Sequence, residues 1–162
     1  MDWTHWQPGM RATLLFVVRD GEILLIRKKR GLGAGKINGP GGKIEPGETP
    51  LASALRETQE ELCIEPTDPE EAGILRFQFT DGLALECHVF RATKFRGEAV
   101  ETDEAIPRWT PVDAIPYQEM WADDALWLPL LLQRRKFQAW FEFDDETMLS
   151  HEVRETSPGS GA

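Results

Sequence analysis

Residues 42–64 read GKIEPGETPLASALRETQEELCI, and the rest of the chain is arranged around this stretch. Thr49 suits the N-cap of a helix, and Pro50 suits its first position, where the missing N–H costs no hydrogen bond. Four residues at helical spacing predict the stripe that faces the core: Leu51, Leu55, Thr58 and Leu62. The sequence therefore predicts a glycine-rich loop that leads directly into an amphipathic helix.

Three glutamates, Glu57, Glu60 and Glu61, share another face of this helix. Like charges at i, i+3 and i+4 repel each other, so helix stability does not explain the cluster, in which Arg56 is the only cation. Carboxylate oxygens bind magnesium or manganese, which bridge to substrate phosphates. The alternative is a solvated acidic helix face. The glycines upstream favour the metal site, because they let backbone approach a ligand closely.

These residues resemble the signature of the Nudix hydrolases, whose glycine and polar anchors all occur here at the family spacing: Gly42, Glu48, Arg56, Glu57, Glu60 and Glu61. Two positions depart from that signature. Thr58 replaces an aliphatic residue, and its hydroxyl can bond back to the preceding turn. Cys63 replaces a glycine. We expect either a different helix end there or strain of roughly 1 kcal/mol in a left-handed conformation.

The composition is that of a globular domain, with 41% hydrophobic and 28% charged residues. A net charge of -10 argues against binding to nucleic acid or to an anionic membrane. Cys63 and Cys87 suggest no disulfide framework, so a cytoplasmic location is expected. The N-terminus has no signal-peptide pattern, and no apolar run is long enough to cross a bilayer.

The remaining pattern predicts strand pairs interrupted by two helices. We expect strands over 10–18, 22–27, 74–80, 83–92 and 108–112, a second helix over 123–135, and a terminal hairpin over 137–143 and 148–154. Residues 66–71 read as an acidic linker, and Pro129 should kink the second helix or mark its true start. The fold class is α/β, and the resemblance implies a Nudix-type α/β/α sandwich with a mixed sheet between helices. We expect one domain over 1–156 and a disordered tail over 157–162.

Segments outside the signature resemble the animal oxidised-purine nucleoside triphosphatases within this family. They are KKRG at 28–31, GAGKING at 33–39, MWADD at 120–124 and WLPLLLQ at 127–133. The resemblance implies a small-molecule nucleotide substrate such as 8-oxo-dGTP or 2-hydroxy-dATP. It also implies that seven residues line the base pocket: Thr13, Lys28, Asn38, Phe77, Trp121, Asp123 and Asp124.

Each of these residue types suits a purine. Trp121 offers a flat face for stacking, and the amide of Asn38 can pair with a base edge. Asp123 and Asp124 cannot both ionise cheaply in one enclosed site, so one can donate a hydrogen bond while the other accepts one. The alternatives are that Trp121 belongs to the core and that the two aspartates cap the helix.

Other positions near this pocket depart from the animal relatives. Leu32 and Pro40 replace aromatic residues, Ile37 replaces a tryptophan, and the loop over 80–86 is one residue shorter. The substrate range is therefore less firmly implied than the chemistry.

The implied reaction is hydrolysis of a nucleoside triphosphate to the monophosphate and pyrophosphate. Magnesium ions, or manganese, would be held by Gly42, Glu57, Glu60 and Glu61, with Glu104 as a further acid. The ions would neutralise phosphate oxygens and activate a water. Glu60, Glu61 or Glu104 would take the proton.

Three supporting roles follow from the same resemblance. Arg56 would orient the acids, and Glu48 would brace the loop on the helix. Lys28 and Lys36 are candidates for phosphate contact. We expect a monomer. The alternatives are a Nudix hydrolase of another nucleoside diphosphate derivative, such as a dinucleoside polyphosphate, and a non-catalytic nucleotide-binding regulator.

Overall fold

The structure is a computed structural model that describes residues 1–156. The predicted tail over 157–162 lies outside the described residues. In chain order the elements are β1 (Met10–Arg19), β2 (Glu22–Lys28), β3 (Ile37–Asn38), β4 (Gly41–Lys43), α1 (Pro50–Leu62), β5 (Ile64–Thr67), β6 (Glu70–Phe79), β7 (Ala84–Ala92), β8 (Lys94–Gly97), β9 (Ala105–Pro111), the 3₁₀ turn η1 (Tyr117–Glu119), α2 (Asp124–Leu132), β10 (Phe137–Asp144) and β11 (Thr147–Glu155).

The sheet is mixed, as the sequence predicts. Within residues 1–156 it has nine strands, in the order β11-β10-β6-β7-β1-β2-β3, with β4 paired to β1 and β9 paired to β2. The β1–β7 and β10–β6 pairs are parallel, whereas β1–β2, β6–β7 and β10–β11 are antiparallel. Both predicted Asp-Gly turns join antiparallel neighbours, because Asp20–Gly21 lies between β1 and β2 and Asp81–Gly82 lies between β6 and β7.

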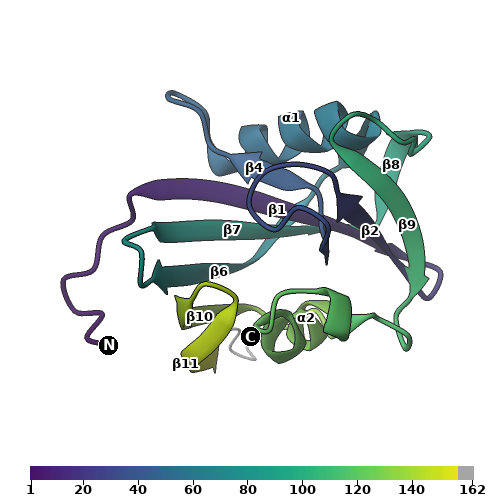
Figure 1. The fold of residues 1–162 in the computed structure, drawn as a ribbon. Coiled ribbons are helices and arrows are strands. Elements are labelled where there is room, and N and C mark those ends of the chain that lie inside the picture. Colours follow the sequence, from purple (N-terminus) through teal and green to yellow (C-terminus); the bar gives the residue numbers. More distant parts are fainter. Residues whose placement is uncertain (157–162) are drawn as a thin grey trace.

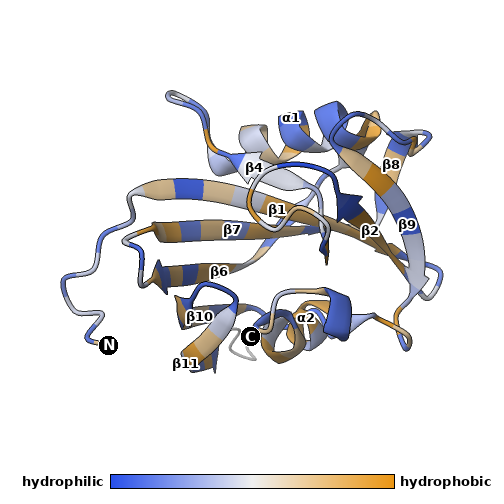
Figure 2. Ribbon diagram, viewed as in Figure 1, coloured by the Kyte–Doolittle hydropathy of each residue, from blue (hydrophilic) through white to orange (hydrophobic). Residues whose placement is uncertain are grey.

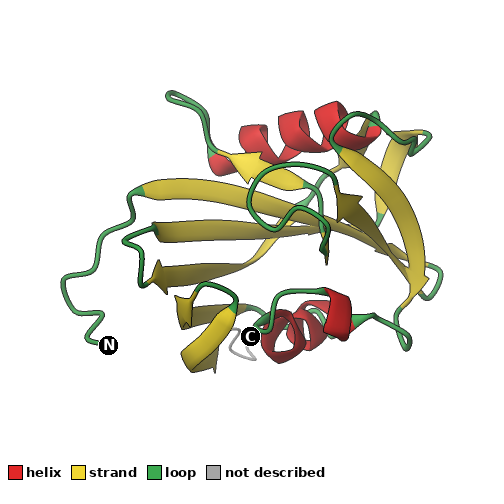
Figure 3. Ribbon diagram, viewed as in Figure 1, coloured by secondary structure: helices red, strands yellow, loops and turns green. Residues whose placement is uncertain are grey.

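The two helices lie on opposite sides of this sheet, which confirms the predicted sandwich (Figures 1 and 3). Alternation along β1 sends Phe16 and Val18 into the core on the α2 side and Leu15 and Val17 into the core on the α1 side. Trp127 of α2 fills the first core. Figure 2 shows hydrophobic residues concentrated along the central strands and in α2. The sheet therefore separates two hydrophobic cores.

Helix α1 begins and ends as its sequence indicates. The Thr49 hydroxyl accepts the backbone N–H of Ala52 at 3.1 Å, and Pro50 occupies the first turn. The Thr58 hydroxyl donates to the carbonyl oxygen of Ala54 at 2.7 Å, one turn back. Cys63 ends the helix in the left-handed conformation, at φ 63° and ψ 30°. Of the two outcomes expected for Cys63, the structure has the strained one.

Two expectations were wrong. Leu51 is exposed, because α1 packs through the smaller residues Ser53, Ala54 and Thr58, which turns the buried stripe away from the first leucine. Residues 66–71 are not a linker. They contribute to β5 and β6, and β5 pairs with β8 in a separate two-stranded sheet. Of the two roles expected for Pro129, the start of α2 is excluded, since the proline lies inside the helix.

The described residues contain no helix that combines the length and the apolar character required to cross a membrane.

Candidate active site

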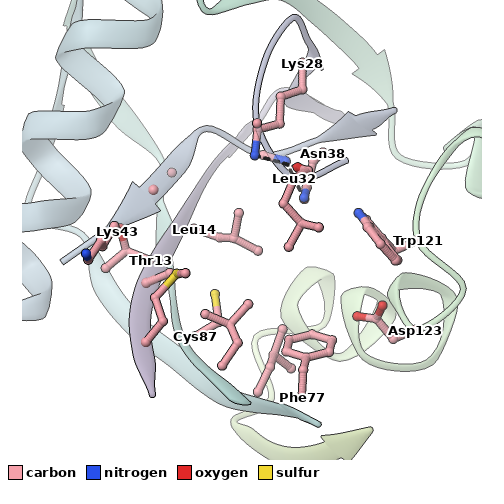
Figure 4. A pocket seen from close by; sticks show the side chains of 18 of the residues that line it. Thr13, Leu14, Lys28, Leu32, Asn38, Lys43, Phe77, Cys87, Trp121 and Asp123 are labelled. Carbon is pink, nitrogen blue, oxygen red and sulfur yellow. Dashed lines mark hydrogen bonds between the residues drawn. The ribbon is translucent and has the colours of Figure 1, made fainter. Parts of the chain in front are cut away.

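One cavity of about 390 Å³ opens beside the sheet between the glycine loop and α2. All seven residues predicted for the base pocket line it: Thr13, Lys28, Asn38, Phe77, Trp121, Asp123 and Asp124. Figure 4 shows Trp121 and Asp123 on one side of the cavity and Thr13 on the other. Glu61 of α1 also lines this cavity. The structure therefore brings the base-pocket residues and one acid of the helix to the same space.

The glycine loop allows α1 to lie close to the sheet. Gly42 in β4 lies against the carboxyl group of Glu57, and a Cβ at that position would come within 2.5 Å of the carboxyl carbon. Gly41 donates its backbone N–H to the Glu61 carboxylate at 3.0 Å. These two contacts explain why glycines precede the acidic helix, because a side chain at Gly42 would occupy the space of the carboxylate.

Arg56 joins three of the signature acids. Its guanidinium bonds to Glu48 at 2.6 Å, to Glu57 at 2.9 Å and to Glu60 at 3.0 Å. Glu48 also accepts the backbone N–H of Glu45 at 2.8 Å, which ties the loop to the helix. The Arg56 hydrogen bonds hold the pKa of Glu48 down at about 2. The predicted orienting role of Arg56 and bracing role of Glu48 agree with this geometry.

Glu61 is the buried acid of the set, with 4% of its surface exposed. Burial raises its pKa to about 8, the Gly41 N–H works against that rise, and neighbouring Glu57 adds to it. Among residues 1–156 no ion pair joins Glu61 to a basic side chain. A buried carboxylate beside a second carboxylate suits a divalent cation, which would stabilise the ionised forms of both.

The described residues do not form a complete metal cage, since no three acidic, histidine or cysteine side chains converge on one point. Glu57 and Glu60 turn toward Arg56, whereas Glu61 turns toward Gly41. Glu104 is exposed in the loop before β9, 3.7 Å from Arg30. Its backbone N–H bonds to the Thr102 hydroxyl, which donates to the Glu61 carbonyl oxygen at 2.7 Å. That chain of bonds ties the loop of Glu104 to the end of α1.

Asp123 and Asp124 are buried at the start of α2, with 2% and 3% of their surfaces exposed. Asp123 makes no capping bond with its side chain and instead accepts the indole N–H of Trp127 at 2.8 Å. Within the described chain, Asp123 Oδ1 and Asp124 Oδ2 are buried without a hydrogen-bond partner. The capping alternative is therefore wrong for the Asp123 side chain, and both acids keep an oxygen available for a ligand.

Burial raises the pKa values of both aspartates above those usual for aspartates on a protein surface. It raises the pKa of Asp123 to about 6, although the Trp127 N–H works against that rise. Burial and the neighbouring Asp123 charge raise the pKa of Asp124 well above its usual value. The pair can therefore share a proton near neutral pH, so that one carboxyl donates while the other accepts.

The other predicted pocket residues have defined orientations. The side-chain oxygen of Asn38 accepts the N–H of Gly39 at 2.8 Å, so its NH₂ group remains to donate to a ligand. The Thr13 hydroxyl is buried without a partner among residues 1–156. Lys28 donates to the carbonyl oxygen of Leu32 at 2.7 Å. Lys36, predicted for phosphate contact, is paired instead with Glu146 at 2.7 Å.

Sequence reasoning missed much of the apolar lining. It includes Met10, Leu14, Leu75, Phe79, Leu85, Cys87 and Trp127. Alternation along β7 could have found Leu85 and Cys87, because both lie on the strand face that also carries core residue Val89. Of the three substituted positions near the pocket, Leu32 lines the cavity and is half exposed, whereas Ile37 and Pro40 are not part of the lining. Leu85, within the shortened 80–86 segment, also lines it.

Comparison with known proteins agrees with this geometry. Residues 8–131 match the family model described as the NUDIX domain. The zebrafish (Danio rerio) oxidized purine nucleoside triphosphate hydrolase is 43% identical over 145 residues, which cover 88% of this chain and 93% of that protein. The mouse (Mus musculus) protein of the same name is 41% identical over the same coverage.

The fold has a solved counterpart. The crystal structure of a MutT protein from Bacillus halodurans superposes with a TM-score of 0.80 at 30% identity, over 89% of this chain and 97% of that one. Two features together define a Nudix hydrolase. They are the glycines packed against the acidic residues of α1 and the mixed sheet between two helices. The chain belongs to the Nudix family.

Proposed function

We propose that this protein hydrolyses oxidised purine nucleoside triphosphates, among them 8-oxo-dGTP and 2-hydroxy-dATP, to the monophosphate and pyrophosphate. The observation that carries the proposal is that Glu61 and the Asp123–Asp124 pair line one cavity. A nucleotide could place its phosphates beside Glu61 and its base beside Asp123 and Asp124. The names of the zebrafish and mouse relatives support this substrate class. Such an activity would sanitise the nucleotide pool.

The base end of the cavity supports recognition of an oxidised purine. Trp121 would stack on the ring, a contact worth about 1–3 kcal/mol per base. The free NH₂ group of Asn38 would donate to one edge of the base. Asp123 and Asp124 would meet the other edge, and their shared proton could move between them. The two arrangements present opposite donor and acceptor patterns, so one pocket could accept oxidised guanine and oxidised adenine.

The phosphate end would be built on the glycine loop and α1. Lys28 lines the cavity beside this end and would contact the phosphates. The carboxylate and carbonyl oxygens of this end suit a divalent cation, magnesium or manganese, which would be held by Gly42, Glu57, Glu60, Glu61 and Glu104. When bound, such an ion neutralises phosphate charge and makes a water a better nucleophile.

The chain's own residues would handle the proton and the geometry. Arg56 keeps Glu57 and Glu60 in place, and the Gly41 N–H orients the Glu61 carboxylate. A carboxylate must take the proton from the attacking water, and Glu60, Glu61 and Glu104 are the candidates. Glu61 is favoured, because it is the candidate that lines the cavity.

The setting of the activity is part of the proposal. A single domain over 1–156 would carry the whole site and would act as a monomer on a small nucleotide, with no membrane or nucleic-acid partner. Cys63 and Cys87 are both free, which suits a reducing compartment such as the cytoplasm. The net charge of -10 disfavours a nucleic-acid partner.

Two alternatives need an experimental comparison. A related hydrolase could act on another nucleoside diphosphate derivative, such as a dinucleoside polyphosphate. A non-catalytic regulator could bind nucleotides with the same fold, but it would have no need to keep every acid of the signature, and this chain keeps them all.

The test is hydrolysis of a nucleotide panel with magnesium or manganese, followed by pyrophosphate release. We expect 8-oxo-dGTP and 2-hydroxy-dATP to be preferred over dGTP, dATP and dinucleoside polyphosphates. Glu61→Gln should lower turnover by about 100-fold or more while the protein stays folded, whereas Glu65→Gln, at an exposed position of β5, should leave it unchanged. Equal rates for Glu61→Gln and wild type would contradict the metal assignment. A preference for another nucleotide class would contradict the substrate.

A further inference from the structure

Lys36 connects three segments of the pocket rim. It belongs to the glycine loop before β3, and its ammonium group lies 2.7 Å from the Glu146 carboxylate in the β10–β11 turn. The same ammonium lies 5.3 Å from the ring centroid of Trp121, just after η1. These segments are far apart in the sequence, and Lys36 is the side chain that contacts the other two.

Trp121 is also held by apolar groups, while it lines the cavity. Phe79 and Phe143 meet it at near-right angles, with centroids 6.0 and 5.6 Å away. Gly33 lies against the indole nitrogen so closely that a Cβ there would come within 2.7 Å. The ring therefore lies between two strands and the glycine loop, and the Lys36 ammonium supplies its charged contact.

The ion pair of Lys36 with Glu146 and its contact with Trp121 argue against the predicted role of Lys36 as a phosphate ligand. Lys36 is outside the lining of the cavity, whereas Lys28 is part of it. An exposed ion pair contributes little by itself. The Lys36 side chain, however, is only 23% exposed, and its contact with a tryptophan face is favourable in addition to the ion pair.

The charge of Lys36 also reaches the acid pair. Burial raises the pKa of Asp124, and the Lys36 charge works against that rise. One cation therefore contacts the stacking residue and acts on the acid that would read the base edge.

We propose that the Lys36–Glu146 ion pair is a clamp that positions Trp121 for stacking, which makes both residues determinants of purine affinity. The proposal rests on the proposed function for its substrate class. Lys36 is a positioning residue here, because it acts through the indole ring. Glu146 holds the ammonium over that ring, and the clamp closes the rim between the glycine loop and the terminal hairpin.

A substrate-independent measurement tests the clamp first. Protein labelled with 5-fluorotryptophan gives one ¹⁹F resonance for each tryptophan, and Trp121→Phe identifies the resonance of Trp121. Lys36→Met and Glu146→Gln should both shift or broaden that resonance. Lys94→Met, an exposed lysine on β8, is the matched control and should leave it unchanged. A Trp121 resonance that is unaffected in both clamp variants would overturn the proposal.

Kinetics then separates a clamp from a phosphate contact. Loss of the clamp should raise KM for the oxidised purine triphosphate about three- to tenfold in Lys36→Met and in Glu146→Gln, with kcat within about twofold. A phosphate-binding lysine would instead be released by Glu146→Gln, so KM would stay unchanged or fall. The double variant Lys36→Glu/Glu146→Lys should recover part of the lost affinity, because it rebuilds the ion pair.

A double-mutant cycle then tests whether Lys36 acts through Trp121. In a Trp121→Leu background, Lys36→Met should cause no further rise in KM, since the ring that it positions is gone. Additive effects of the two substitutions would overturn the clamp. If wild-type protein hydrolyses no oxidised purine nucleotide, the proposed function is wrong, and the ¹⁹F result still decides whether the clamp exists.

Discussion

Asp123 accepts the indole N–H of Trp127 at 2.8 Å, and the two side chains lie together in the wall of the cavity. The bond spans one helical turn, and it fixes one oxygen of Asp123 while the other stays buried without a partner among residues 1–156. The carboxyl group of Asp123 therefore lines the cavity and does not cap α2. This geometry supports the proposed role of the acid pair in base recognition, which a test of substrate choice can check.

Asp123→Asn and Asp124→Asn are each expected to change the ratio of 8-oxo-dGTP to 2-hydroxy-dATP hydrolysis by about tenfold or more. The physical reason is that an amide cannot exchange a proton with the neighbouring carboxyl, so one of the two donor–acceptor patterns is lost. Hydrogen bonds to charged groups contribute about 1.5–3 kcal/mol, which corresponds to this range. The measurement is kcat/KM for both nucleotides. Asp113→Asn, at an exposed position, is the control, and parallel losses on both nucleotides would argue against base-edge recognition.

The acid pair also predicts a pH-dependent stability. The pKa of Asp123 rises from its usual 3.8 to about 6 in the folded protein, so the folded state binds more protons than the unfolded state between these values. The free energy of unfolding should therefore fall as the pH rises from about 4 to 6, by at most about 1.4 kcal/mol per pH unit. The raised pKa of Asp124 extends this loss to higher pH.

Thermal unfolding of wild type and Asp123→Asn at several pH values measures this effect. The two proteins should have similar midpoints near pH 4, and the asparagine variant should become the more stable one as the pH approaches 7. Asparagine keeps an oxygen that can accept the Trp127 N–H, so the packing is preserved. A midpoint difference that stays constant from pH 4 to 7 would mean that the buried carboxyl costs no stability in its ionised form.

Much of α1 could be predicted from the sequence, because its determinants are local. Thr49, Pro50 and Thr58 act within one turn of their own positions, and all three make the contacts that their chemistry indicates. The order of the strands was not predicted. The pocket residues came from resemblance, since no local rule brings Asn38 to the same cavity as Asp124.

Tertiary contacts explain what the sequence could not show. The acidic segment with Pro66 resembles a linker, yet Pro66 pairs with Phe95 in a small sheet that depends on β8. Leu51 has the right spacing for the core, but the close approach of Ala54 to the sheet turns it outward. The partner of Lys36 lies in the terminal hairpin, and no sequence pattern links it to the glycine loop.

Gly42→Ala is expected to keep the fold and to lower turnover by about 100-fold. The new Cβ would lie 2.5 Å from the carboxyl carbon of Glu57, and this carboxyl is the movable end of a side chain, so it would be displaced while the backbone stays in place. A misplacement of about 1 Å in a catalytic group can cost two orders of magnitude in rate. Nucleotide hydrolysis and circular dichroism measure the two effects.

Two other glycines are the controls for this variant. A Cβ at Gly9 would find its nearest neighbour at 3.8 Å, so Gly9→Ala should retain activity and stability. A Cβ at Gly41 would come within 1.9 Å of the Thr13 carbonyl oxygen, so Gly41→Ala should damage the fold itself. Wild-type turnover in Gly42→Ala would show that the position of Glu57 does not limit the reaction.

Cys63→Gly should stabilise the protein by about 0.5–1 kcal/mol, because Cys63 ends α1 at φ 63°, a conformation that disfavours any residue with a Cβ. For a domain of this size, that gain corresponds to a rise of about 1–4 °C in the unfolding midpoint. Cys63→Ala is the matched control, since it removes the thiol but keeps the Cβ, and its midpoint should stay at the wild-type value. If alanine and glycine raised the midpoint equally, the thiol would be the source of instability and not the backbone. An unchanged midpoint in Cys63→Gly would mean that the helix end accommodates the cysteine without strain.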